Sequence, residues 1–102
     1  MKVRLNRPPV IFKNFSGVAE INLKDFVEAY PSQRTVIMNM LGYENGDIPK
    51  EAFEKAFEDG KNLIRFTMYD GEYINCEIGY PEDKWAIQKT ENTKVFTKED
   101  LK

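Results

Sequence analysis

The sequence predicts an α+β fold in which an N-terminal extended segment and three short helices pack on one face of an antiparallel sheet of about four strands. Residues 63–97 contain short runs of alternating apolar and polar residues separated by turn residues, which is typical of a meander. Between residues 22 and 60, apolar residues recur at helical spacing in three stretches. The first 21 residues hold scattered apolar residues, interrupted by Pro8 and Pro9, where we expect short extended segments.

The length and composition limit what kind of protein this is. A chain of 102 residues fits one small globular domain, residues 1–102. The net charge of -2 excludes a strongly basic nucleic-acid module and a strongly acidic DNA mimic. The single cysteine, Cys76, cannot form an internal disulfide, so we expect a buried thiol in a reducing compartment. No apolar run approaches the roughly 20 residues of a membrane span. We therefore expect a cytoplasmic protein that makes no membrane contact.

The N-terminal segment is basic and contains two aromatic residues that a nucleic acid would stack on. Proline cannot donate a ladder hydrogen bond, so a strand in this segment is expected at a sheet edge or after the prolines. An edge strand with solvated bases is the favoured interpretation. A nucleic-acid-binding arm is the alternative, with Phe12 or Phe15 stacking on bases. The basic residues are Lys2, Arg4, Arg7 and Lys13.

The first two helices have recognisable ends. Asn22 is a good N-cap for a helix that begins at Leu23, and Pro31 ends it. Ser32 is the expected N-cap of the second helix, which Gly42 ends. Because residues 35–37 are β-branched, a strand is the alternative there. The apolar faces comprise Leu23, Phe26, Val27 and Tyr30 in the first helix, and Val36, Ile37, Met40 and Leu41 in the second.

The third helix is predicted between Asp47, as its N-cap, and Gly60, with Pro49 in its first turn. Its apolar stripe, with Phe53 and Phe57, is expected to be buried against the sheet. Its outer face is acidic, although Lys55 lies four residues after an acid, in the favourable order for an ion pair. Acids at a helix C-terminus oppose the macrodipole, which makes this face a candidate partner-binding surface, with a merely solvated face as the alternative. The acidic candidates are Glu51, Glu54, Glu58 and Asp59.

The turn at Asp70–Gly71 allows two hairpin registers. A two-residue loop pairs Tyr69 with Glu72 and mixes apolar and polar residues on both faces of the hairpin. A three-residue loop pairs Met68 with Glu72 and keeps one face apolar, so it is the favoured register. It also places Gly71 at positive φ, and sets Phe66 opposite Ile74 and Ile64 opposite Cys76.

The meander is expected to continue through residues 85–90 and 94–97, followed by a helical turn at residues 97–100. The favoured register assigns each side chain to one of two faces. The inner face is predicted to hold Ile64, Phe66, Met68, Ile74, Cys76, Ile78, Tyr80, Trp85, Ile87 and Phe96. The outer face is predicted to hold Leu63, Arg65, Thr67, Tyr73, Asn75, Glu77, Ala86, Gln88 and Val95. On this outer face Arg65 and Tyr73 are the candidate partner anchors, because these residue types are favoured at interface cores.

The residues favour a binding role over catalysis. The chain has no histidine and one cysteine, so the common nucleophile–base sets and zinc sites are absent, and no cofactor fingerprint occurs. We expect a non-enzymatic domain that binds another protein with a basic surface, such as an inhibitor, an immunity protein or an anti-CRISPR-like protein of a phage or plasmid. A nucleic-acid-binding accessory protein is the alternative. Partner identity and oligomeric state leave no signal in the sequence.

Overall fold

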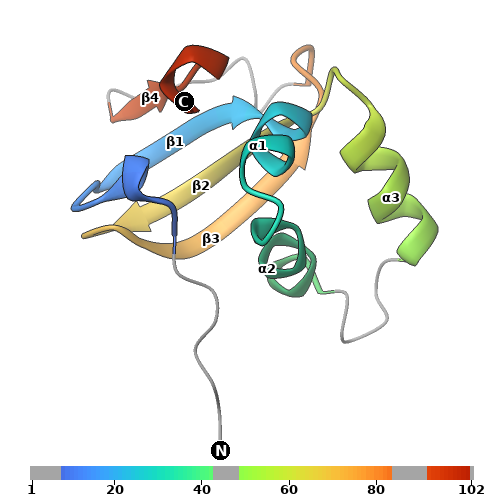
Figure 1. Cartoon of the computed structure of the whole chain (residues 1–102), viewed down its shortest axis with the longest axis horizontal. Helices are drawn as coiled ribbons and strands as arrows, with labels where there is room; N and C mark the ends of the chain where they lie inside the picture. The colour runs from blue at the N-terminus through green and yellow to red at the C-terminus, as the bar shows by residue number, and fades with distance from the viewer. Residues whose placement is uncertain (1–7, 43–48, 84–91, 102) are drawn as a thin grey trace, which may run out of the picture.

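The computed structural model describes residues 8–42, 49–83 and 92–101, and it confirms the α+β class. Helices and strands alternate in blocks along the chain, as Figure 1 shows. The described elements are η1 (Val10–Phe12), β1 (Gly17–Asn22), α1 (Leu23–Ala29), α2 (Gln33–Met40), α3 (Lys50–Glu58), β2 (Leu63–Tyr69), β3 (Glu72–Gly79), β4 (Thr93–Val95) and η3 (Lys98–Leu101).

The four described strands form one sheet in the order β3-β2-β1-β4. The β1–β2 and β2–β3 pairs are antiparallel, whereas β4 runs parallel to β1, so the sheet is mixed rather than purely antiparallel. The expectation of a strand that starts after the prolines is confirmed by β1, but the favoured edge position is wrong, because β1 lies between β2 and β4. It starts at Gly17, well after Pro8 and Pro9, so no missing proline N–H interrupts its ladders. Ala19, Glu20 and Ile21 in the middle of β1 are all buried.

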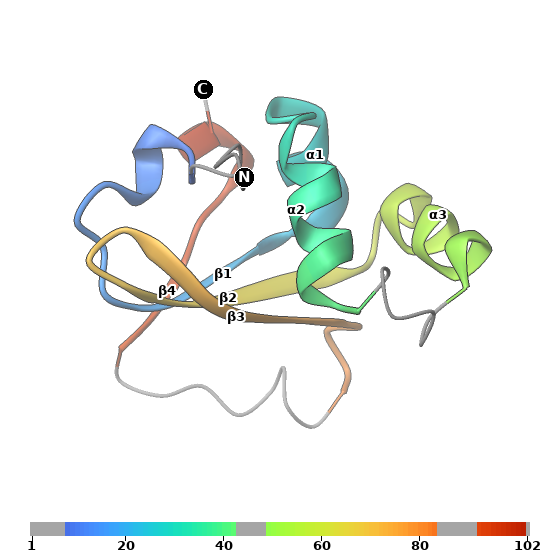
Figure 2. The same cartoon turned by 90° about the horizontal axis from the view of Figure 1, so that it is seen from below.

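Helices α1 and α2 lie on one face of the sheet, as predicted (Figure 2). Figure 2 shows η1, α1, α2 and η3 above the strands, with α3 beside the end of the sheet. One buried cluster fills the space between the layers, and the benzyl ring of Phe12 lies at its centre with no exposed surface. This ring contacts the rings of Phe26, Phe66 and Phe96 at centroid distances of 5.9, 5.8 and 5.2 Å. Phe53 and Phe57 of α3 are buried, which confirms the predicted apolar stripe.

The helix ends follow local chemistry in part. The side chain of Asn22 accepts a hydrogen bond from the Asp25 N–H, which confirms the first predicted cap. The side chain of Ser32 makes no cap bond, because the Gln33 and Arg34 N–H groups donate to the backbone carbonyls of Tyr30 and Pro31. The predicted cap Asp47 lies outside the described residues. Helix α3 begins directly after Pro49 and ends at Glu58, with Asp59 as its C-cap.

The register predicted for the β2–β3 hairpin was wrong. Tyr69 pairs with Glu72, and the loop has two residues with positive φ, Asp70 at 49° and Gly71 at 79°, as in a type I′ turn. Within the turn, the positive φ of Gly71 was predicted correctly. Met68 lies opposite Tyr73, and the next pair is Thr67 with residue 75, so residue 74 is a β-bulge.

The bulge explains why the sequence pattern was misleading. One extra residue in β3 shifts the alternation, so side chains on both sides of it point to the helices. Tyr73 precedes the bulge and Cys76 follows it, and both face the core. Ile74 itself, predicted inside, is 63% exposed. With the bulge in β3, a two-residue loop therefore no longer mixes apolar and polar residues on both faces of the hairpin.

The C-terminal part is confirmed in its burial and its last turn, whereas β4 does not continue the meander but pairs in parallel with β1. Phe96 is buried, and the Thr97 N–H and hydroxyl both donate to the Asp100 carboxylate, which begins the predicted helical turn. Tyr80, predicted on the inner face, is 38% exposed. The predicted strand at residues 85–90 lies outside the described residues, together with Trp85, Ala86, Ile87 and Gln88.

Candidate interaction surfaces

The predicted acidic face of α3 is only partly open. The side chains of Glu51 and Glu58 are exposed, whereas Glu54 and Asp59 are half-buried. The expected ion pair of Glu51 with Lys55 is not among the ion pairs of the described residues. The two exposed glutamates lie near opposite ends of α3. They are the carboxylates of this face that a partner would reach first.

Asp59 has a role in the fold that the sequence did not indicate. One carboxylate oxygen accepts a 2.9 Å hydrogen bond from the Lys61 N–H, and the other accepts a 2.7 Å bond from the Tyr80 hydroxyl. These donors, the Lys61 N–H first and the Tyr80 hydroxyl second, hold the pKa of Asp59 below its usual value. These two hydrogen bonds give Asp59 a role within the fold, although it lies at the helix end where the dipole disfavours an acid. Asp59 joins the end of α3 to the end of β3.

Arg65, the first predicted anchor of the outer sheet face, is engaged within the protein. Its Nε donates to Oε1 of Glu20 at 2.8 Å across the β1–β2 pair, and the two side chains are only 11% and 7% exposed. A buried guanidinium keeps its charge and needs a carboxylate partner. Arg65 thus lies on the predicted face but is not an open anchor.

Tyr73, the second predicted anchor, lies on the opposite face. Its ring stacks on Phe66 at a centroid distance of 4.4 Å, and its hydroxyl donates a 2.9 Å hydrogen bond to Oε1 of Gln33. Burial raises the pKa of this hydroxyl. The bulge beside it is the physical reason for the wrong assignment. The structure therefore does not bring Arg65 and Tyr73 together on one surface.

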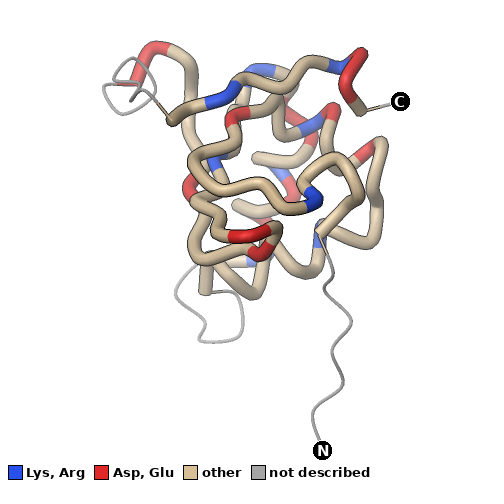
Figure 3. The backbone as a smooth tube through the Cα atoms, turned by 90° about the vertical axis from the view of Figure 1, so that its left-hand side faces the viewer, with Lys and Arg blue, Asp and Glu red and all other residues tan. Residues whose placement is uncertain are grey.

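The structure describes the basic N-terminal arm only in part. Lys2, Arg4 and Arg7 lie outside the described residues, and Lys13 is exposed. Phe12 is in the core and is not available to stack on a base, which corrects that part of the nucleic-acid alternative. Phe15 is half-buried and contacts the Phe96 ring edge-on at 5.9 Å. Figure 3 shows acidic and basic residues interspersed along most of the described chain, whereas residues 70–83 carry five acids and no base.

The thiol of Cys76 is buried, as predicted, with 4% of the residue exposed. Burial, with a smaller contribution from Glu77, raises its pKa to about 12. The thiolate is the nucleophile and the metal ligand, so this side chain is inert near neutral pH. Within residues 8–42, 49–83 and 92–101, no three acidic, cysteine or histidine side chains gather as a metal site would need. The same residues contain no helix with the length and apolar character needed to span a membrane.

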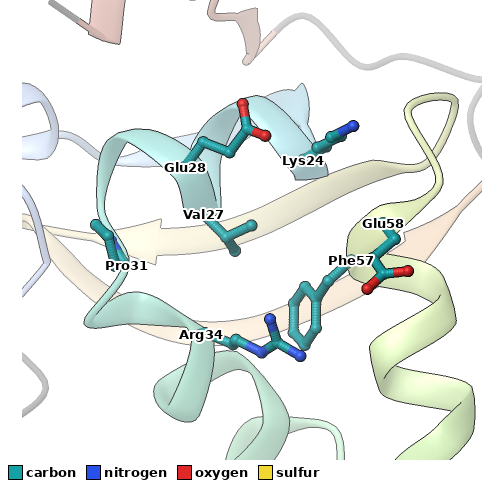
Figure 4. A pocket seen from close by; sticks show the side chains of 7 residues that line it. All are labelled: Lys24, Val27, Glu28, Pro31, Arg34, Phe57 and Glu58. Carbon is teal, nitrogen blue, oxygen red and sulfur yellow. The ribbon is translucent and has the colours of Figure 1, made fainter.

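A cleft between the three helices was not predicted. Its volume is about 220 Å³, and its walls come from all three α-helices and the α1–α2 turn. Figure 4 shows the charged ends of Lys24 and Glu28 on one side of Val27, and those of Arg34 and Glu58 on the other side, beside Phe57. No sequence motif marks this site, because its residues come from segments up to 34 positions apart. The lining residues are Lys24, Val27, Glu28, Pro31, Arg34, Phe57 and Glu58.

Comparison of the chain with protein-family models, with curated proteins and with solved structures finds no match in any of the three.

Proposed function

We propose that this chain is a non-enzymatic domain that docks the acidic face of α3 on a basic surface of a partner protein. The observation that carries the proposal is the exposure of Glu51 and Glu58 on this peripheral helix. Neither carboxylate takes part in an ion pair among the described residues. Two unpaired charges of one sign attract an oppositely charged surface over several ångströms.

The position of α3 suits a docking element. It is anchored to the rest of the fold by Phe53 and Phe57, so its other side is free to meet another molecule. Glu58 adds a specific reason for a partner, because a carboxylate in the last turn of a helix opposes the helix dipole. A Lys or Arg of the partner would relieve this repulsion. The alternative surface, the outer face of the sheet, offers neither predicted anchor, since Arg65 is paired with Glu20 and Tyr73 lies on the core side.

The biological role that best fits such docking is inhibition of the partner. A small domain that acts by occupying a surface needs neither a cofactor nor a catalytic side chain. An inhibitor, an immunity protein and an anti-defence protein of a phage or plasmid all act in this way, and we propose this group as the functional class. Long-range attraction raises the association rate more than it slows dissociation.

The test uses charge reversal on two faces. Three chains are used for affinity capture from the source cells: the parent, Glu51→Lys/Glu58→Lys and Glu72→Lys/Glu77→Lys. The captured proteins are identified by mass spectrometry. The second double variant is the control, because its two glutamates are exposed on β3. The proposal predicts a protein captured by the parent and the control but not by the α3 variant. The rate at which the captured protein associates with the purified parent chain should fall steeply as the salt concentration rises. Equal capture by all three chains would contradict docking through α3.

A further inference from the structure

The cleft between α1, α2 and α3 carries four charged side chains, two of each sign. Lys24 and Glu28 come from α1, Arg34 comes from α2 and Glu58 comes from the end of α3 (Figure 4). No ion pair joins any two of these described side chains, although all four line one cleft of about 220 Å³. Their charges are therefore available to a ligand and sum to zero.

Arg34 is held in place without using its hydrogen-bonding edge. Its guanidinium carbon lies 4.7 Å from the centroid of the Phe57 ring, which is a cation–π contact. The ring of Phe57 is in turn fixed by burial in the core. A guanidinium held through its face keeps its N–H fork for a carboxylate, which it binds with two parallel hydrogen bonds.

We propose that this cleft binds an α-amino acid with an apolar side chain as its zwitterion. The carboxylate of the ligand binds Arg34, and its ammonium group faces Glu58 (Figure 4). The side chain of the ligand lies against Val27 and Phe57. A bare anion would meet two carboxylates, and a bare cation would meet two cations, so only a ligand with both charges complements the site. The volume is below the roughly 300–1,000 Å³ of pockets for drug-sized ligands, which suits a single amino acid.

This site is a second property of the chain and does not depend on a protein partner. The two proposals share only Glu58, so each can fail alone. A ligand in the cleft would bridge the three helices, and it would therefore stabilise their relative positions by mass action. Binding can be measured on the purified chain without knowledge of any partner.

The first experiment separates the two charges of the ligand. Backbone amide shifts are followed by NMR during titration with L-leucine, N-acetyl-L-leucine and L-leucinamide. N-acetylation removes the ammonium charge, and the amide removes the carboxylate. We expect saturable shifts with L-leucine at residues 24–34 and 57–58, and at least tenfold weaker binding of each analogue. No saturable shift with L-leucine, or equal binding of either analogue, would overturn the proposal.

The second experiment assigns the two charges to side chains. Arg34→Gln and Glu58→Gln should each weaken L-leucine binding at least tenfold. Lys98→Gln and Glu72→Gln make the same changes of charge at exposed positions outside the cleft, and should bind like the parent. Arg34→Lys keeps the charge but loses the fork, so it should retain part of the affinity. Amide spectra of each variant establish folding first. Equal affinity in the cleft variants and the controls would overturn the assignment.

Discussion

The hydroxyl of Tyr73 on β3 donates a 2.9 Å hydrogen bond to the side-chain carbonyl oxygen of Gln33 on α2. Gln33 is only 4% exposed, so water does not offer this oxygen an equivalent donor. The bond ties an edge strand of the described sheet to the helix that covers it, across 40 positions of sequence. It also accounts for a tyrosine on the core side of a strand, because a buried phenol needs a polar partner.

Tyr73→Phe should destabilise the protein by about 1–3 kcal/mol, because the buried Gln33 oxygen loses this donor. Chemical denaturation of both chains measures the difference in unfolding free energy. Tyr69→Phe is the matched control, since Tyr69 is 70% exposed on the neighbouring strand and should change stability little. Equal stability of the parent and Tyr73→Phe would mean that the hydrogen bond contributes nothing net.

The two glycines at 60 and 71 should respond oppositely to alanine. Gly71 has φ of 79°, and a Cβ there would lie 2.9 Å from the Asn14 nitrogen, so Gly71→Ala should cost at least about 1 kcal/mol. At Gly60 nothing lies within 4 Å of an added Cβ, and alanine would restrict the unfolded chain. Gly60→Ala should therefore be neutral or slightly stabilising. Melting temperatures of the two variants compare them directly, and similar losses at both sites would contradict the turn geometry.

Local signals explain what the sequence predicted well. Helix α1 was predicted because its cap and its end are encoded by adjacent residues, and α3 because Phe53 and Phe57 repeat at helical spacing. The hairpin failed because one bulge reverses which residues face the core. That bulge is justified only by distant partners, such as Gln33 for Tyr73. Neighbouring residues cannot reveal such a partner.

The same distinction between local and long-range signals applies to the candidate interaction surfaces. The acids of α3 were visible as a local excess of charge, but Asp59 proved to be a structural acceptor of Lys61 and Tyr80. The central position of β1 depends on pairing with β2 and with β4, both more than 40 residues away. The cleft depends on three helices converging, so no single segment carries its signature. Sequence periodicity thus identified elements, and long-range pairing decided which surfaces they form.

The bond between Asp59 and Tyr80 predicts a dependence of stability on pH. Folding lowers the pKa of Asp59, so the charged form of Asp59 stabilises the fold at pH values above the ordinary pKa of about 4. That contribution is lost as pH falls through the lowered folded-state pKa. Tyr80→Phe removes one donor and should raise the pKa of Asp59 toward its ordinary value.

A carboxyl-carbon NMR titration of the parent and of Tyr80→Phe measures this change directly. Denaturation at several pH values should show the largest stability difference between them near neutral pH, with convergence below about pH 4. Tyr69→Phe should leave the Asp59 titration unchanged. An Asp59 pKa that is the same in all three chains would exclude the hydrogen bond as its cause.

Glu20 and Arg65 form the buried ion pair across β1 and β2, so removal of either charge should be costly. Glu20→Gln leaves the guanidinium, 11% exposed, without its carboxylate, and we expect a loss of roughly 3–5 kcal/mol. Glu77→Gln is the control, because Glu77 also lies beside Arg65 in the sheet but is exposed. It should change stability by less than about 1 kcal/mol. In Glu20→Leu/Arg65→Met no charge remains buried, and most of the loss should be recovered. Denaturation of the parent, Glu20→Leu, Arg65→Met and the double variant gives the coupling energy, and a negligible value would mean that solvent already screens the pair.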